Sequence, residues 1–184
     1  MKRILVLAAL LVAFTFQAFA QAKSKTALPA VDMINHVYFY QLSTNQVTPL
    51  EKQAATMKTK TSIMGYGGAK VLLAIDGGTS AVRVPKSDTL RFVINTGGAA
   101  PEFNLYKLEV AKKTRQATTQ QAKGMLGGGN NSAGGGTIVV NTIQLRPGIY
   151  QIVPASKLDS GEYFFMAKPT LSSANSDAYA FAID

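Results

Sequence analysis

Apolar and polar side chains alternate along most of this chain, most clearly over residues 137–167. Two similar phrases divide that stretch, Leu145-Arg-Pro-Gly-Ile-Tyr150 and Leu158-Asp-Ser-Gly-Glu-Tyr163. In each phrase a glycine can adopt a positive φ at little steric cost, and a tyrosine then begins a new alternating run. The pattern predicts three β-strands joined by two tight corners.

The remaining runs of this kind predict strands at 36–42, 69–75, 80–84, 89–95, 103–110 and 178–183. Residues 50–64 begin with helix formers but end in alternating Thr, Lys and Ile, so we expect one long, largely exposed strand there. The apolar parity changes between Leu105 and Tyr106, which predicts a bulge or a change of sheet. Residues 112–121 either continue that strand or form a hairpin arm, and 76–78 are expected to form a hairpin turn.

These strands predict an all-β fold, a single antiparallel two-sheet β-sandwich over residues 31–184 with a Gly-rich loop at 124–136. The Leu-x-x-Gly-x-Tyr phrase resembles the tyrosine corner of immunoglobulin-like and fibronectin-like sandwiches. The Cys and Trp of a true immunoglobulin core are missing, so only the sandwich class carries over. An outer-membrane barrel is the rival fold, but the chain ends in Asp184 and several strands are apolar on both faces.

The first twenty residues have the three parts of a secretory signal peptide. Lys2 and Arg3 precede an apolar run at 4–16, and Ala18-Phe19-Ala20 follows as a cleavage site. Because the apolar run is shorter than the ~20 residues of a membrane span, we expect cleavage and no transmembrane segment in the mature chain. A flexible lead-in follows at 21–30. We therefore expect an exported protein, periplasmic or at the cell surface, whose cysteine-free core holds without disulfides.

The chain is basic, with a formal net charge of +9 that falls to +7 when Lys2 and Arg3 are removed. This charge favours anionic partners, and a tyrosine beside Lys or Arg suits contact with sugars or peptides. The densest cluster of basic residues consists of Lys107, Lys112, Lys113, Arg115 and Lys123. The residues predicted to contact a ligand are Tyr66, Tyr106, Lys107, Lys112, Lys113 and Arg115.

No catalytic, cofactor or metal site is predicted. His36 is the only histidine, there is no cysteine, and the ten acidic residues are dispersed. A pair of carboxylates for glycoside hydrolysis, such as Glu109 with Glu162, would have to be assembled by the fold. The glycine run at 65–70 lacks the Gly-Lys-Ser/Thr ending of a phosphate loop and precedes a strand rather than a helix.

The chain resembles small exported bacterial β-sandwich proteins of uncharacterised function. It shares with them the Ala-x-Ala leader, GYGGAK at 65–70, SGEY at 160–163 and FAID at 181–184. The resemblance implies no activity for any residue. We expect a non-enzymatic module of the bacterial envelope that binds an anionic polysaccharide or another envelope protein, and no specific nucleic acid. The alternatives are a hydrolase with spatially assembled carboxylates and a structural surface or appendage subunit that adds a strand to a partner.

Overall fold

The computed structural model describes residues 30–61, 69–122, 132–133, 136–167 and 175–184. Within these ranges the chain forms β-strands and no helix. The all-β class predicted from the alternating pattern is confirmed. The leader, most of the lead-in, Tyr66 and most of the Gly-rich loop at 124–136 lie outside the described residues.

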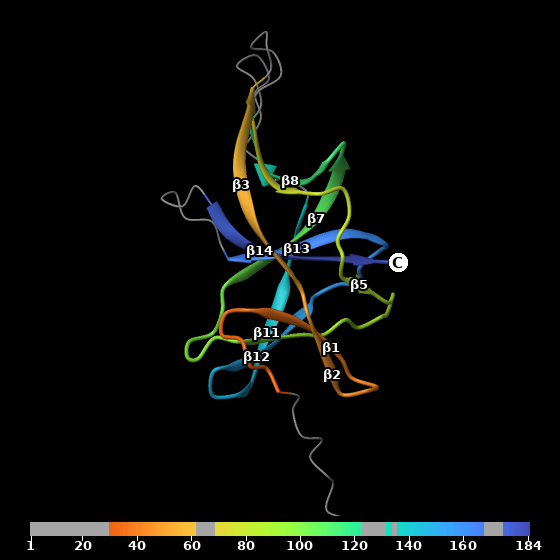
Figure 1. Cartoon of the computed structure of the whole chain (residues 1–184). Coiled ribbons are helices and arrows are strands. Elements are labelled where there is room, and N and C mark those ends of the chain that lie inside the picture. Colours follow the sequence, from red (N-terminus) through yellow and green to blue (C-terminus); the bar gives the residue numbers. More distant parts are fainter. Residues whose placement is uncertain (1–29, 62–68, 123–131, 134–135, 168–174) are drawn as a thin grey trace, which may run out of the picture.

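Five strands form sheet A, which occupies the lower half of Figure 1. In spatial order they are β11 (Val140–Arg146), β12 (Ile149–Pro154), β6 (Phe92–Asn95), β1 (Val37–Gln41) and β2 (Gln46–Pro49). All neighbours in this sheet are antiparallel. The aromatic strand β1 is an inner strand, which agrees with its apolar side chains on both faces.

Sheet B contains nine strands and lies mostly above sheet A in Figure 1. Its members are β3 (Glu51–Thr61), β4 (Ala69–Asp76), β5 (Arg83–Val84), β7 (Phe103–Ala111), β8 (Thr114–Ala122), β9 (Ser132–Ala133), β10 (Thr137–Ile138), β13 (Gly161–Ala167) and β14 (Asn175–Ile183). The path β7-β13-β14-β3-β4-β8 closes because β8 also pairs with β7. The predicted open two-sheet sandwich is therefore too simple, since six strands of sheet B form a closed barrel.

Two apolar cores share the strands β7, β13 and β14. One core lies between sheet A and these strands, and it joins Phe92 and Ile152 of sheet A to Phe165 and Phe181 of sheet B. The other core fills the barrel. It contains fewer residues than the first, among them Leu73 and Phe164. Consecutive residues of the shared strands point to opposite faces, so these strands are buried on both sides.

This arrangement explains the parity change in β7. Leu105 faces the core between the sheets, while Tyr106 faces the barrel interior. Pairing of β7 with β13 runs without a register shift, so the predicted bulge or change of sheet is wrong. In β14 the large side chains of Tyr179 and Phe181 enter the inter-sheet core, and Ala178 and Ala180 face the narrow barrel.

The connections confirm some turn predictions and correct others. The first corner is a β11–β12 hairpin, and the second carries the chain from sheet A into β13 of sheet B. Over the described part of 50–64, Glu51–Thr61 form the long strand β3, as predicted, and β8 (Thr114–Ala122) forms a hairpin arm with β7. The hairpin turn predicted at 76–78 is wrong, because β4 pairs with β3 and β8 while the next strand, β5, joins β14.

Candidate functional site

Two of the predicted ligand-contact residues are buried. Tyr106 is only 2% exposed, and its ring packs in the barrel against Phe164. Its hydroxyl accepts a hydrogen bond from Asn104 Nδ2 at 3.1 Å, and burial raises its pKa. The prediction that Tyr106 presents its side chain to a ligand is therefore wrong, because β7 turns this residue toward the barrel interior.

Arg115 is fully buried and holds an ionic cluster at one end of the barrel. Its Nη1 donates to Glu162 Oε2 at 3.2 Å, and its Nη2 lies 3.3 Å from Glu51 Oε1. Two backbone carbonyls, of Asp76 and Gly77, accept the remaining bonds at 3.1 Å. A guanidinium provides five donors in a rigid fork, and here that fork ties β8 to β3, β13 and the end of β4. The predicted ligand contact by Arg115 is also wrong, because the side chain of Arg115 on β8 is buried inside the barrel.

The cluster brings together two carboxylates that lie far apart in the sequence. Glu51 accepts bonds from Ser80 Oγ at 2.6 Å and from the Ala81 amide at 3.2 Å. Glu162 accepts bonds from the Thr79 hydroxyl at 2.9 Å and the Ser80 amide at 3.0 Å. Burial opposes ionisation of Glu51, but the bond from Ser80 and the charge of Arg115 outweigh it, and its pKa falls below the usual 4.5.

These contacts make the cluster an anchor rather than a reaction centre. Each of the four carboxylate oxygens accepts at least one hydrogen bond from the protein. A general acid or base needs a lone pair or proton free to reach a substrate. What the two carboxylates do instead is hold residues 79–81, which carry the chain from β4 to β5. The pair Glu109 and Glu162 is not assembled, since Glu109 is exposed and Glu162 is buried in this cluster.

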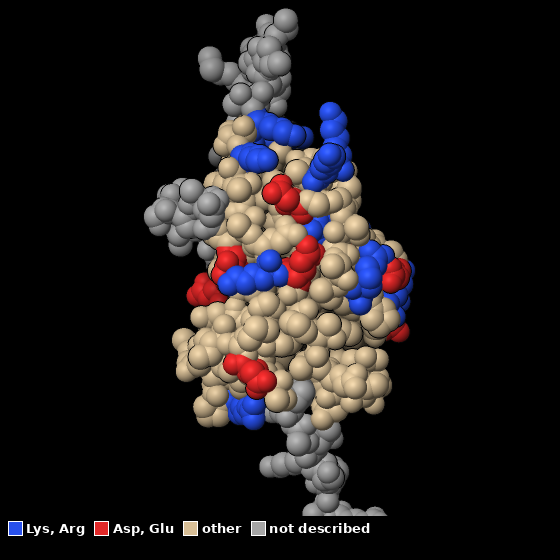
Figure 2. Space-filling view, in the orientation of Figure 1, with Lys and Arg blue, Asp and Glu red and all other residues tan. Residues whose placement is uncertain are grey.

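Three exposed lysines lie side by side on the outer wall of the barrel. Lys60 of β3 is the direct register partner of Lys70 of β4, and Lys58 lies two residues before Lys60 on the same face. Among the described residues no carboxylate forms an ion pair with any of them. Figure 2 shows basic side chains near the upper end of β3. We call Lys58, Lys60 and Lys70 the lysine strip.

The strip continues into a pocket where β7 and β8 diverge. These strands pair only from Glu109 with Gln116 to the hairpin turn, and beyond that point Gly136 lies between them. The pocket has a volume of about 430 Å³, and its lining residues are Lys70, Lys107, Leu108, Glu109, Gln116, Ala117, Thr118 and Gly136.

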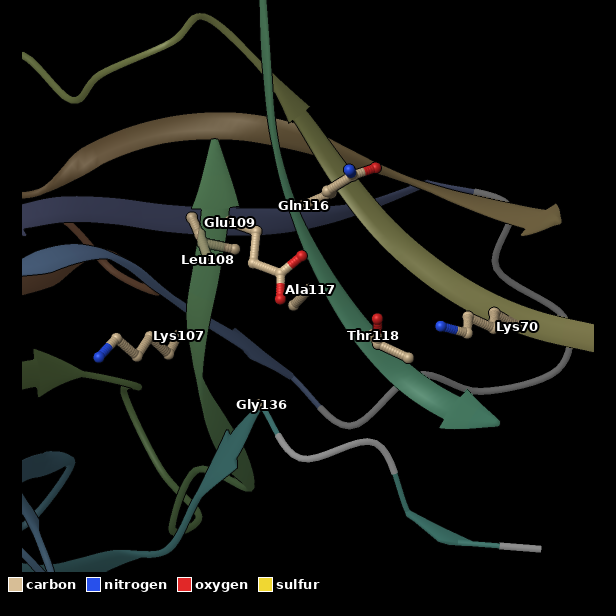
Figure 3. Close-up of a pocket in the computed structure, with 8 residues that line it drawn as sticks. All are labelled: Lys70, Lys107, Leu108, Glu109, Gln116, Ala117, Thr118 and Gly136. Atoms are coloured by element: carbon tan, nitrogen blue, oxygen red, sulfur yellow. The ribbon is translucent and has the colours of Figure 1, made fainter. Parts of the chain in front are cut away.

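Figure 3 shows how the polar side chains of this pocket are placed. Lys70 extends from β4 toward Thr118, and Glu109 points from β7 toward β8, whereas Lys107 points away from both. Lys107 also lies 4.0 Å from Asp159, so part of its charge is balanced. Of the predicted contact residues that the structure describes, Lys107 alone lines this pocket.

Lys112 and Lys113 are exposed in the turn between β7 and β8, at the end of the barrel that Arg115 closes. Lys112 has a φ of 57°. These two lysines are available for contact but line none of the pocket described above.

Sequence reasoning missed Lys70 because nine residues separate it from Lys60 in the chain. The sequence did contain one sign of the lysine strip: Lys58 and Lys60 are two residues apart, which places both on one face of a predicted strand. The partner strand and its register were needed to bring Lys70 opposite Lys60.

His36 has a packing role. Its ring makes edge contacts with Tyr38 and Tyr179, with centroids 5.3 Å apart in each case, and its Nε2 lies 3.0 Å from the Leu50 carbonyl oxygen. In the part of the chain that the structure describes, no three His, Asp or Glu side chains gather as metal ligands. The same residues include no helix of the length and apolarity that crossing a bilayer requires.

No family model matches the chain, and no curated protein gives a significant match.

Proposed function

We propose that this protein is an exported, non-enzymatic binding module that holds an anionic polysaccharide against the lysine strip and the adjoining pocket. The observation that supports this most directly is the pairing of Lys60 with Lys70 across β3 and β4. Like charges directly opposite each other in an antiparallel pair destabilise the sheet. A protein that keeps such a pair without a neutralising carboxylate gains most when a ligand supplies the negative charge.

The pocket beside the strip suits a carbohydrate. Gln116 and Thr118 offer an amide and a hydroxyl, which can donate to and accept from sugar hydroxyl groups. Lys70 adds a cation within the same pocket. Glu109 is the one acidic side chain in the lining, and it lowers the positive charge of the pocket beside the lysine strip.

Export is part of the proposal and is supported by the leader at residues 1–20. The mature chain would act in the periplasm or at the cell surface, where acidic polysaccharides and other envelope proteins are available as partners. The absence of cysteine is compatible with that location, because the two apolar cores stabilise the fold without disulfides.

The hydrolase alternative has less support. The carboxylates that the fold does assemble, Glu51 and Glu162, are both hydrogen-bonded to Arg115 and to residues 79–81. The structural-subunit alternative is supported by a different part of the molecule, the edge of sheet A where β11 pairs with β12 alone among the described strands.

Binding of the mature chain to polygalacturonate, with neutral dextran as reference, tests the proposal. Replacing both Lys60 and Lys70 by Gln should weaken binding about tenfold, because two charge-assisted contacts are lost. The same variant should be more stable than the wild type by about 0.2–1 kcal/mol without polymer, since the like-charge pair is gone. Raising the salt concentration should weaken wild-type binding.

The matched control removes the same charge elsewhere. Lys112→Gln with Lys113→Gln also lowers the net charge by two, but at the hairpin turn. If this variant loses as much affinity as the Lys60, Lys70 variant, binding follows net charge and the strip is not the site. Wild-type protein that binds no better to polygalacturonate than to dextran at low salt would refute the proposal.

A further inference from the structure

Sheet A has two edges that differ in how well they are protected. Along one edge runs β2, a strand of four residues that ends in Pro49. Short strands and proline are common ways of preventing further strand addition. Along the other edge runs β11, which pairs with β12 on one side and with no described strand on the other.

The β11 edge has few protective features. It is seven residues long, VNTIQLR, and its only charge is Arg146 at the end. A register shift between Gln144 and Arg146 interrupts the ladder there, but 140–144 pair regularly with β12. Ile143 is 51% exposed in the middle of the strand. An exposed edge of this kind, rich in β-forming residues, is a template for another strand.

Charge is distributed so that another copy of this basic chain can approach the edge. On the face shown in Figure 2 most charged side chains lie over the barrel and on the right-hand side, while the lower half, which carries β11 and β12 in Figure 1, shows fewer, with an acidic and a basic group close together at its lower left. The lysine strip lies on β3 and β4, on the opposite side of the shared strands from sheet A. Two copies joined at β11 would therefore keep their lysine strips apart, and depletion of charge is typical of an interface centre.

We infer that two copies of this protein associate through their β11 strands, antiparallel and about a two-fold axis at Ile143, to form one continuous sheet. This pairing places Ile143 opposite its own mate and buries the exposed side chain of each. It also sets Thr142 opposite Gln144 and Asn141 opposite Leu145, so no like charges face each other. The interface is isologous, as in most homodimers. This inference does not depend on the proposed polysaccharide site.

Sedimentation equilibrium of the mature chain, from low micromolar to near-millimolar concentration, measures the association. We expect a monomer–dimer equilibrium. Ile143→Lys and Ile143→Glu should each weaken the dimer about tenfold or more, because each puts a like-charge pair at the two-fold axis. An equimolar mixture of the two variants should dimerise again as a heterodimer, since Lys and Glu then face each other.

A matched control keeps the chemistry but moves it away from the edge. Val110, on β7 of the barrel, is 55% exposed, and Val110→Lys should leave the dimer unchanged. A protein that stays monomeric throughout the concentration range overturns the inference. So does a dimer that survives both Ile143 variants, or a Lys and Glu mixture that fails to associate while each variant remains folded by circular dichroism.

Discussion

Gly148 allows two loops to pack backbone against backbone. Its φ is +75°, and a Cβ at this position would lie 3.1 Å from the carbonyl carbon of Gly97. The Thr96 amide donates to the Gly148 carbonyl at 2.8 Å, and the Tyr150 hydroxyl donates to the Gly98 carbonyl at the same distance. The β11–β12 turn and the loop after β6 are thus locked together.

Gly148→Ala should lower the free energy of unfolding by about 1–3 kcal/mol, because it combines a strained φ with a backbone clash. Urea denaturation measures the change. Gly98→Ala is the control, since a Cβ there meets nothing within 4 Å and the φ is not positive. Equal losses in the two variants would show that glycine at 148 is not required by the close approach.

The second corner has the bond expected of a tyrosine corner. The Tyr163 hydroxyl donates to the carbonyl of Asp159, four residues earlier, at 2.8 Å. Tyr150, in the similar first phrase, instead bonds across to the loop after β6. The two similar segments therefore differ in structural role, because the first lies in the β11–β12 hairpin and the second in the connection between the two sheets.

At the scale of elements, the interior of the barrel changes from apolar in its middle to polar at one end. The middle of the barrel is apolar, with the alanines of β14 leaving room for Phe164 and Met166 of β13. One end is polar, and Arg115 links β8 to Glu51 of β3 and Glu162 of β13 there. Breaking a buried ion pair by removing one partner is costly because the other charge stays unpaired.

The acid side of the stability profile should depend on Glu51. Because its pKa in the folded protein is lowered below 4.5, Glu51 contributes stability above its unfolded pKa, and this contribution is lost as the pH falls through the folded pKa. Glu51→Gln should lower the free energy of unfolding at neutral pH by about 1–3 kcal/mol. It should also flatten the decline below about pH 4.5.

Urea titrations from neutral pH into the acid range measure both effects. Glu109→Gln is the control, since Glu109 is exposed and forms no ion pair among the described residues. If the Glu51→Gln and wild-type curves stay parallel through acid pH, the contacts with Ser80 and Arg115 do not lower the pKa of Glu51.

At the scale of the whole molecule, sheet A and the barrel are held together by shared walls. The strands β7, β13 and β14 present one face to the inter-sheet core and the other to the barrel interior. Neither core can lose its packing without exposing an apolar face of these three strands. The two parts should therefore unfold together.

Thermal unfolding followed by far-ultraviolet circular dichroism and by tyrosine fluorescence should give one coincident transition. Phe92→Ala in the inter-sheet core and Leu73→Ala in the barrel should each lower the midpoint of that same transition, at a cost of about 2–5 kcal/mol. Separate transitions for the two probes, or a variant in which one part melts while the other persists, would contradict shared cooperativity.

The alternation of apolar and polar residues was enough to predict the all-β class and most strand positions. The alternation at 50–64, 103–110 and 178–183 is a local property, because each residue's side of a strand follows from period two alone. The sequence also predicted Lys107 as a contact residue, and Lys107 lines the pocket. It predicted a tyrosine at each corner: the Tyr163 hydroxyl closes its own corner, whereas the Tyr150 hydroxyl bonds to the loop after β6.

Which strands are neighbours, and therefore where the candidate site lies, became known only from the packing of the folded chain. Pairing of β7 with β8 closes the barrel, turns Tyr106 and Arg115 inward and leaves the pocket where the two strands diverge. Register between β3 and β4 sets Lys60 opposite Lys70. Alternation reports that a strand has two faces, but which face is covered depends on partners distant in sequence, and no local pattern encodes them.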